Sequence, residues 1–537
     1  MSSHPVTDPA PAHVAPGETG SRLDDWWARV LRTPTRLRIW YWGAPIGVTL
    51  LAAVLRLWDL GSPHALVFDE TFYVKDAWSL FHLGYEGSWP AKADEQFNSG
   101  KTDIFLSSPS FVAHPPLGKW IIALGMAATG AGNAFGWRVA TAVVGILAVL
   151  LVFLLARALF RSTIIAAIAG FLLAIDGHAI VMSRVALLDN MVMFFGLLAF
   201  GCILLDRSWH ARRLAASVMA ARSAGRSPEW GPVLWWRPWL IAAGILCGLC
   251  AGVKWSGFYF LAFFAVYTVV VDAVARRREG LAFYVSGATL KQAPATFVLM
   301  VPIAFLVYIA TWTGWIVTDG GYYRHWAEST HMQWTGLLSS VPLWLQNLWH
   351  YQTEMYNYSI NLHVPHPYQS NPLTWLFMIR PTSMYYVGTT QGQGGCDVSS
   401  CSAAITSLGN PLIWWAGAAA LFYLLYRLVR YREWQVGLIL TGLAAGYLPW
   451  MLYINRTIFQ FYSIAFEPYL ILGLAATIAI VLGSRTDARP RRRRGIAWVA
   501  VFLAAAALLS VYFWPIWTGE QIPFWFWQMH MWLPSWV

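Results

Sequence analysis

Long apolar stretches separated by polar segments fill the chain from residue 38 onward. A helix rises about 1.5 Å per residue, so roughly 20 apolar residues cross the hydrocarbon core of a bilayer, which is about 30 Å thick. Stretches of about this length predict eleven helices, near residues 39–57, 135–156, 163–182, 189–205, 238–253, 255–273, 294–316, 410–426, 434–453, 461–483 and 496–516. We therefore expect an all-α polytopic membrane protein with about eleven transmembrane helices.

The segments outside these stretches differ in length and character. A shorter, glycine-rich apolar stretch at 117–130 predicts a helix lying at the membrane surface. Two long segments, about 58–134 and 317–409, are rich in Trp, Tyr, His, Gly and Pro. Residues 1–37 are polar and rich in Pro and Arg, without the apolar core of a cleaved signal peptide. We expect 1–37 to be a disordered cytoplasmic tail and 38–537 to form one transmembrane domain.

The basic residues assign a side to each loop. With the N-terminus in the cytoplasm, 26 of the 37 lysines and arginines fall in inside segments, among them 207–237 and 485–494. Cytoplasmic loops of membrane proteins carry such an excess of positive charge. This arrangement explains the net charge of +11 without nucleic acid as a partner. It places 58–134, 317–409 and the C-terminus outside.

Composition narrows the class of protein. Hydrophobic residues make up 57% of the chain and charged residues 12%, which excludes a soluble cytosolic enzyme, a disordered chain and a secreted disulfide scaffold. A carrier for a lipid-linked sugar would concentrate its polar residues at mid-membrane and keep its loops short. Here the polar residues gather in outer loops, which favours an enzyme working at the outer face of the membrane.

Two adjacent acids stand just after the first predicted span. Asp69 and Glu70 lie in the segment VFDETFYVKDAW, flanked by Phe68 and Tyr73. Adjacent carboxylates point in different directions, so we expect different roles for them. A carboxylate held near aromatic groups is a good general base. The same spacing also fits a solvated loop acid, or a helix N-cap at Asp69.

Basic residues near the outer ends of spans are the second candidate set. Charges at such depths are costly and often functional, and arginine suits a lipid-linked phosphate. An interfacial anchor, or a partner for an acid such as Asp189, fits equally well. The segment AHPPLGKW, with His114 and Lys119, reads as a rigid turn and an anchor. The outer basic residues at span ends are Arg138, Arg184, Lys254 and Arg456.

Some signals are missing from the sequence. It holds neither an HExxH metal motif nor a nucleotide-binding loop, and its five cysteines match no zinc or redox spacing. An outer-face enzyme therefore needs an activated donor delivered in the membrane, such as a polyprenyl phosphate sugar. Cys396 and Cys401 share an outer loop, where a disulfide between them is expected if their Cα atoms come within about 7 Å.

Six motifs in order resemble one family. They are VFDETFY, AHPPLGKW, FGWRVATAVVG, SRVALLDN, HPYQSNPLTWLFMIRPTSMYY and FQFYSIAFEPYL. Together they resemble the protein O-mannosyltransferases of the actinobacterial branch, which are membrane glycosyltransferases of the GT-C class. The resemblance covers about residues 38–537 and implies that this range is a GT-C catalytic domain.

The resemblance also implies a reaction. Mannose would pass from polyprenyl phosphate mannose to Ser or Thr hydroxyls of proteins crossing the plasma membrane, with inversion in a single displacement. The matching positions imply catalytic roles for Asp69 and Glu70, with Asp69 as base. Donor phosphate binding falls to Arg138 and Arg456, with Lys254. His114, Lys119, Arg184 and Asp189 are implied as supporting residues.

The resemblance leaves several points open. Relatives in eukaryotes carry a β-trefoil domain in the large outer loop, but 317–409 is about 90 residues and too short for one. No cofactor is implied, no dedicated metal ligands are evident, and metal dependence stays open. The expected partners are the lipid donor, translocated protein acceptors and the bilayer. The alternatives are a transferase of the same fold with a lipid or cell-wall glycan acceptor, and a transporter of a lipid-linked sugar.

Overall fold

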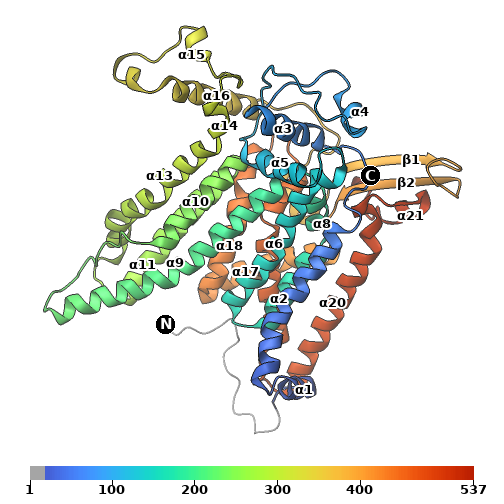
Figure 1. The fold of residues 1–537 in the computed structure, drawn as a ribbon. Helices are drawn as coiled ribbons and strands as arrows, with labels where there is room; N and C mark the ends of the chain where they lie inside the picture. The colour runs from blue at the N-terminus through green and yellow to red at the C-terminus, as the bar shows by residue number, and fades with distance from the viewer. Residues whose placement is uncertain (1–18) are drawn as a thin grey trace.

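The computed structural model describes residues 19–537, in which long helices form a bundle (Figure 1). Eight helical segments of the described chain are long and apolar enough to cross a membrane. They are α2 (Pro34–Leu57), α6 (Ala134–Phe160), α9 (Asp189–Ser223), α11 (Gly257–Arg278), the α12–η1–α13 segment (Tyr284–Thr311), α17 (Pro411–Tyr431), α18 with η4 (Trp434–Tyr453) and α20 (Arg489–Thr518).

The remaining apolar helices explain why the expected number of spans is not confirmed. α7 (Thr163–Ile175) and α8 (Gly177–Arg184) are bent by 59° and would make a ninth span together. α10 (Pro238–Val253) and α19 (Glu467–Leu482) have 16 residues each, about 24 Å of helix, which is shorter than the core of a bilayer. Each of the eleven expected ranges overlaps a helix, so the all-α polytopic architecture is confirmed and the count of eleven is not.

Asp176 causes the break between α7 and α8. Its carboxylate accepts hydrogen bonds from the backbone N–H groups of His178 and Ala179, 2.9 and 3.4 Å away. These are the groups that a helix N-terminus leaves without partners. The same carboxylate accepts from the backbone N–H of Asn410, at 3.0 Å, and so ties the start of α17 to this bend.

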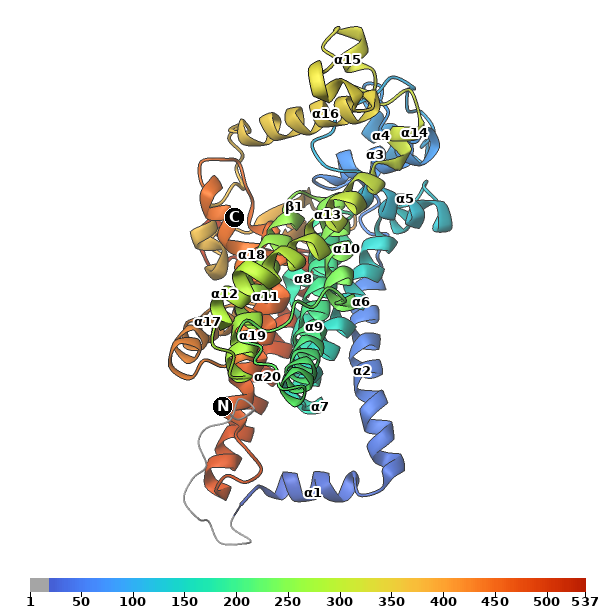
Figure 2. The same cartoon turned by 90° about the vertical axis from the view of Figure 1, so that its left-hand side faces the viewer.

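The long polar segments gather at one end of the bundle, here called the loop-rich end (Figures 1 and 2). The opposite end, here called the basic end, carries α1, the far end of α9 and the start of α20. The helices of the loop-rich end are α3 (Glu70–Leu83), α4 (Ala93–Asn98), α5 (Leu117–Thr129), α14 (Thr313–Val317), α15 (Trp326–Ser329), η2 (Gly336–Ser340), α16 (Leu343–Ile360), η3 (Pro372–Phe377), η5 (Gln460–Ala465), α21 (Phe524–Met529) and η6 (Pro534–Trp536).

A small sheet adds to the helical architecture at the loop-rich end. β1 (Thr382–Thr390), β2 (Ser400–Ser407) and β3 (Gln521–Pro523) pair antiparallel in that order. Cys396 in the β1–β2 connection and Cys401 in β2 form the expected disulfide, with Cα atoms 5.9 Å apart. β3 comes from the end of the chain, so the sheet joins the 317–409 segment to the C-terminal residues.

The disorder expected for residues 1–37 does not hold for the part that the structure describes. Residues Arg22–Val30 form helix α1, and α2 begins at Pro34. Ser21 caps α1 by accepting from the backbone N–H of Asp24, and Asp24 pairs with Arg492 at 2.8 Å. The partner Arg492 is distant in the sequence, so the composition of the tail does not reveal this ion pair. Residues 1–18 lie outside the described range, and a domain boundary at residue 38 stays a prediction.

Small residues let the elements around the site approach closely. A Cβ on Gly118 of α5 would lie 2.7 Å from Cδ2 of Leu188 and 3.1 Å from Cγ1 of Val253. These two residues directly precede Asp189 and Lys254 in the sequence. Gly118 therefore lets α5 pack against the start of α9 and the end of α10.

Candidate active site

Lys254 lies at the centre of a group of polar side chains at the loop-rich end. It follows the last residue of α10, in the short turn before α11. Its Nζ donates to both carboxylate oxygens of Asp189, at 2.9 and 3.1 Å. The same Nζ lies 4.0 Å from the centre of the Tyr462 ring. Lys254 is thus a buried cation whose position is fixed by a carboxylate and an aromatic face.

Asp69 faces this pair from the start of α3. Its side chain is half-buried, does not cap α3, and makes no hydrogen bond or ion pair within residues 19–537. Burial raises the pKa of Asp69 to about 6, while nearby Lys254 lowers it and Asp189 raises it further. A carboxylate in this state is ionised at neutral pH and well matched to accept a proton.

The backbone turn that presents Asp69 is held by aromatic packing. Phe68 has a φ of 48°, a left-handed conformation that is uncommon for a residue with a side chain. Its ring packs edge-on against Phe459 and Phe461, with centres 5.7 and 5.6 Å apart. Both partners belong to the late FQFYSIAFEPYL motif, so that segment packs against the turn that carries Asp69.

Glu70 occupies a different environment from its neighbour. It is fully buried, and its two carboxylate oxygens accept four hydrogen bonds. Two come from Nε and Nη2 of Arg138, at 2.8 and 2.9 Å, and two from the backbone N–H groups of Val67 and Ala186, at 3.0 and 2.8 Å. The side chain has no surface for an acceptor hydroxyl. This environment fits a residue that supports the site rather than one that contacts the acceptor.

The donor phosphate role expected for Arg138 is not supported by the structure. Besides Glu70, its guanidinium donates to the backbone carbonyls of Leu60, Pro63 and Ala65, at 2.9 to 3.3 Å. All five of its N–H groups are used, and the side chain is 1% exposed. Arg138 therefore folds the loop before Asp69 rather than facing a ligand.

Arg184 has a similar structural role. Its guanidinium donates to the backbone carbonyls of Arg56, Trp58 and Asp59 at the end of α2. A helix end leaves such carbonyls without partners. Arg184 thus fixes the chain as it leaves α2 toward Asp69. This gives it a supporting place that its motif alone did not specify.

Arg456 differs from the other arginines of the candidate set. It lies between η4 and η5, is half-buried, and its side chain forms no hydrogen bond or ion pair within residues 19–537. Its Nε is buried without a partner. The charge of Arg456 acts on His114, whose pKa burial holds well below its ordinary value, with Lys254, Lys119 and Arg456 lowering it further. Arg456 therefore belongs to the same site and has N–H groups free for an anion.

The residues of the AHPPLGKW segment line the other side of the site. The His114 ring lies 6.0 Å from that of Tyr73 and, with its low pKa, is neutral at physiological pH. Lys119 is buried, pairs with Glu86 and donates to the His114 carbonyl at 3.1 Å. The Lys119 ammonium therefore binds groups of the protein and does not serve as an anchor at the lipid surface.

Pairing leaves a simple balance of charge. Lys254 and Asp189 form one ion pair, and Lys119 and Glu86 form another. Within each pair the two charges neutralise each other. Within residues 19–537, the Asp69 carboxylate and the Arg456 guanidinium near Lys254 have no ion-pair partner. A displacement at a sugar phosphate needs one group to accept a proton and one to stabilise the leaving anion. The arrangement offers both.

Three residues of this region were not foreseen from the sequence as parts of the site. Tyr462 lies in the FQFYSIAFEPYL motif among several aromatic residues, and the sequence does not indicate which of them contacts Lys254. Asp76 and Glu86 had no distinguishing pattern. Burial raises the pKa of Asp76 to about 7, with Lys119 lowering it and Glu86 raising it. Within residues 19–537, no group of three or more His, Cys, Asp or Glu residues is placed to hold a metal ion.

Comparison with known proteins identifies the family. Residues 46–318 match the family model for dolichyl-phosphate-mannose-protein mannosyltransferase. The chain belongs to this family. Residues 344–536 match the model for the C-terminal four-transmembrane region of protein-O-mannosyltransferase. Asp69 lies in the first matched range and Arg456 in the second, so the candidate site joins both parts. The resemblance that six sequence motifs indicated is confirmed.

Individual relatives agree with this assignment. A polyprenol-phosphate-mannose–protein mannosyltransferase of Mycolicibacterium smegmatis is 34% identical, over 92% of this chain and 93% of its own. One of Corynebacterium glutamicum is 30% identical, over 94% of each chain. The Saccharomyces cerevisiae Pmt1-Pmt2 complex bound to the sugar donor has a chain that matches with a TM-score of 0.65 and 15% identity, covering 97% of this chain and 95% of that one. The expected GT-C fold is thereby confirmed.

Proposed function

We propose that the protein is a glycosyltransferase that moves mannose from polyprenyl phosphate mannose to Ser or Thr hydroxyls of proteins, in a single inverting displacement at its loop-rich end. Membership of the family and the names of its relatives support the donor and the protein acceptor. The observation that carries the mechanism is the unpaired Asp69 carboxylate and the unpaired Arg456 guanidinium beside the buried Lys254–Asp189 pair.

In this mechanism Asp69 takes the proton of the acceptor hydroxyl as its oxygen attacks C1 of the mannose. The bond between C1 and the phosphate oxygen breaks, and its electron pair leaves with the polyprenyl phosphate. Arg456 receives the developing charge with a planar set of donors that matches a phosphate. Lys254 adds a fixed positive charge, because Asp189 and Tyr462 hold it in place.

The remaining candidates act by holding the catalytic groups. The Glu70–Arg138 pair fixes the loop that ends at Asp69. Arg184 fixes the start of that loop, and Lys119 fixes the backbone at His114. Neutral His114 adds no further positive charge beside Asp69, so the base keeps its ability to accept a proton.

We further propose that the loop-rich end faces the outside of the plasma membrane and that the N-terminus is cytoplasmic. The excess of lysine and arginine at the basic end supports this orientation. The acceptors would then be secreted or membrane proteins that meet the site during translocation.

The decisive experiment is product analysis with purified protein. Incubation with polyprenyl phosphate mannose and a Ser/Thr-rich peptide should yield peptide carrying one α-linked mannose on a hydroxyl. A parallel incubation replaces the peptide with a glycolipid acceptor. Transfer to the glycolipid but not to the peptide would move the acceptor class to lipid, and absence of transfer to either would contradict the proposal.

A further inference from the structure

A cavity at the basic end lies far from the catalytic group, beneath helix α1. Its volume is about 590 Å³, and it lies where α6 ends, α7 begins and α19 joins α20. This size falls in the range of roughly 300–1,000 Å³ typical of small-molecule sites. Its apolar wall includes Trp27, Leu31, Trp40, Phe160 and Leu482, and its basic residues are Arg161, Arg485 and Arg492.

The orientation of α1 places this cavity at a membrane surface. α1 lies across the axis of the bundle, next to the ends of the long helices (Figure 2). Its apolar residues Leu23, Trp26, Trp27 and Val30 follow the three- and four-residue spacing of one helix face. Leu23 is 52% exposed and Trp26 48%, so part of this face points away from the protein. Helices of this kind lie in the interface between lipid and water.

The protein holds α1 over the cavity with specific contacts. Nε and Nη2 of Arg492 donate to the Asp24 carboxylate, at 3.0 and 2.8 Å. The backbone N–H of Gly20 donates to the carbonyl of Asp487 at 3.0 Å. On the cavity side, the Trp27 ring meets Trp40 edge-on, with centres 4.9 Å apart. The cavity therefore has a fixed roof and an aromatic wall.

Two of the three arginines that line the cavity, Arg161 and Arg485, have guanidinium N–H groups without a hydrogen-bond partner among residues 19–537. Arg492 uses four of its five N–H groups on Asp24 and on the carbonyls of Leu482 and Gly483. Arg161 makes no side-chain hydrogen bond or ion pair within residues 19–537, and its side chain is exposed. Arg485 has only a 3.7 Å approach to Asp24. The rim of an apolar cavity thus carries two guanidinium groups that lack a full partner.

We propose that this cavity binds an anionic glycerophospholipid, with its phosphate between Arg161 and Arg485 and one acyl chain against Trp27 and Trp40. Charged hydrogen bonds from arginine suit a phosphate diester, and the aromatic wall suits hydrocarbon. The place of the cavity at the ends of several membrane-spanning helices matches the depth at which a phospholipid carries its headgroup.

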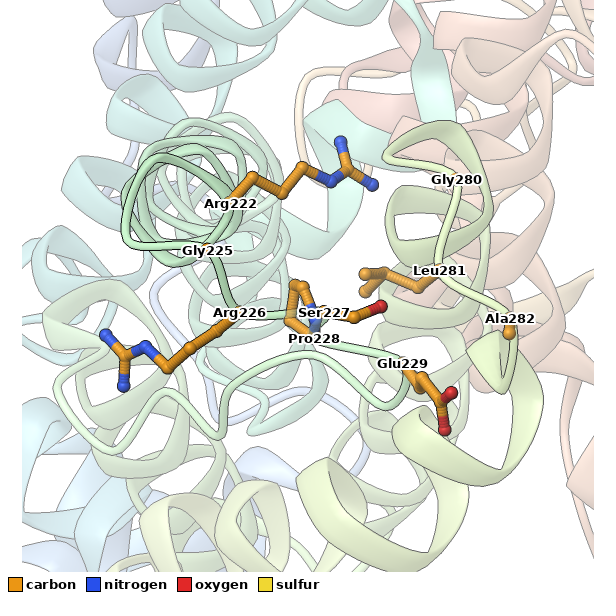
Figure 3. Close-up of a pocket in the computed structure, with 9 residues that line it drawn as sticks. All are labelled: Arg222, Gly225, Arg226, Ser227, Pro228, Glu229, Gly280, Leu281 and Ala282. Atoms are coloured by element: carbon orange, nitrogen blue, oxygen red, sulfur yellow. The ribbon is translucent and has the colours of Figure 1, made fainter.

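A second cavity at the same end provides a matched control. It has a volume of about 460 Å³ and is lined by Arg222, Arg226 and Glu229, together with Leu281 and small or polar residues (Figure 3). In Figure 3 the two arginine side chains point in different directions, and Arg222 donates to the carbonyl of Glu279 at 2.6 Å. With two arginines, one glutamate and no aromatic side chain in its lining, this cavity has guanidinium groups but lacks the aromatic wall of the first.

The test measures lipid retention by the purified full chain. Native mass spectrometry compares phosphatidylglycerol with phosphatidylcholine on wild type, on the double variant Arg161→Gln/Arg485→Gln, and on the control Arg222→Gln/Arg226→Gln. We expect wild type and control to retain phosphatidylglycerol alike and the double variant to bind it about tenfold more weakly or worse, since a charged hydrogen bond contributes about 1.5–3 kcal/mol. Equal loss in the control, or equal retention of phosphatidylcholine by wild type, would overturn the proposal.

A second measurement needs no variant and identifies the lipid class. A photoactivatable phosphatidylglycerol with its reactive group in the acyl chain should label peptides that contain Trp27 and Trp40 in the wild-type protein. Excess phosphatidylglycerol should suppress the labelling. Suppression by polyprenyl phosphate but not by phosphatidylglycerol would assign the cavity to the lipid carrier instead, and labelling only elsewhere would contradict a site beneath α1.

Discussion

Asp69 and Glu70 are adjacent in the sequence but chemically opposite in the structure. Glu70 accepts four hydrogen bonds and is sealed from solvent, whereas Asp69 has an unpaired carboxylate beside Lys254. Of the two acids, Asp69 is therefore the one that we propose as the catalytic base. Asp76, which lies two turns further along α3, also has a raised pKa but faces Lys119 and Glu86.

We expect Asp69→Asn to lose mannose transfer by about 10²–10⁴-fold, the usual contribution of a general base. The variant should insert and melt like wild type, because the Asp69 carboxylate makes no hydrogen bond to break. Single-turnover assays with the lipid donor and a peptide measure the loss. Asp76→Asn serves as the matched control and should retain most activity. A loss below tenfold in Asp69→Asn would assign the base elsewhere.

The pH dependence of transfer follows from the same group. Transfer requires the ionised carboxylate, so kcat/KM should fall about tenfold per pH unit below the pKa of Asp69 and level off above it. Burial raises that pKa to about 6, against about 4 for an ordinary aspartate. Rates measured from pH 4.5 to 8 should therefore level off above about pH 6. The profile should persist in Asp76→Asn, and a profile already flat at pH 5 would contradict the assignment.

Arginines of the site separate into a binding group and a folding group. We expect Arg456→Ala to lower transfer by about 10²–10³-fold at unchanged thermal stability, since in the proposed mechanism it removes a donor to the leaving phosphate. Arg138→Ala should instead lower the melting temperature and the yield, because it leaves the buried Glu70 carboxylate without its cationic partner. Assays of rate and of thermal melting on both variants separate the two. Wild-type activity in Arg456→Ala would make Arg456 a simple anchor.

Secondary structure was largely predictable here, because apolar stretches of about 20 residues have few alternatives to a helix. The exceptions have local causes. The bend at Asp176 depends on a cap, and the β1–β2 hairpin lies in a Gly- and Ser-rich stretch without alternating apolar residues. The role of Arg138 was not predictable, because its carbonyl partners lie more than 70 residues away in the chain. Sequence spacing identifies a charge near the site but not the groups that neutralise it.

Close packing of α5 against the ends of α9 and α10 yields a further prediction. We expect Gly118→Ala to displace Leu188 or Val253, at a cost of about 1–3 kcal/mol for overpacking. Because these residues precede Asp189 and Lys254, the catalytic rate should fall while the protein still inserts. Gly43→Ala in α2 is the matched control, since a Cβ there meets nothing within 4 Å. Equal rates in the two variants would show that α5 does not set the position of the ion pair.

The two ends of the molecule differ in charge and in the segments that they carry, and this difference predicts the orientation of the protein in the membrane. The segments 58–134 and 317–409 lie at the loop-rich end with the catalytic group, and 207–237 and 485–494 lie at the basic end (Figure 1). In the proposed function, a donor delivered on a lipid and an acceptor that is being translocated both meet the protein on the outer side. The excess of arginine at the other end favours the cytoplasm.

We therefore expect a membrane-impermeant maleimide to label Ser339→Cys on intact cells and to label Ser223→Cys only after permeabilisation. Both positions are exposed serines, Ser339 in η2 of the loop-rich end and Ser223 at the basic end of α9, so the two substitutions are chemically matched. Four of the five native cysteines interfere little, because Cys247 and Cys250 are buried and Cys396 and Cys401 are bridged, and the unsubstituted protein gives the background from the half-buried Cys202. Labelling of Ser223→Cys alone on intact cells would show the opposite membrane orientation, with the site in the cytoplasm. Labelling of both on intact cells would contradict a bundle whose ends lie on opposite sides of one membrane.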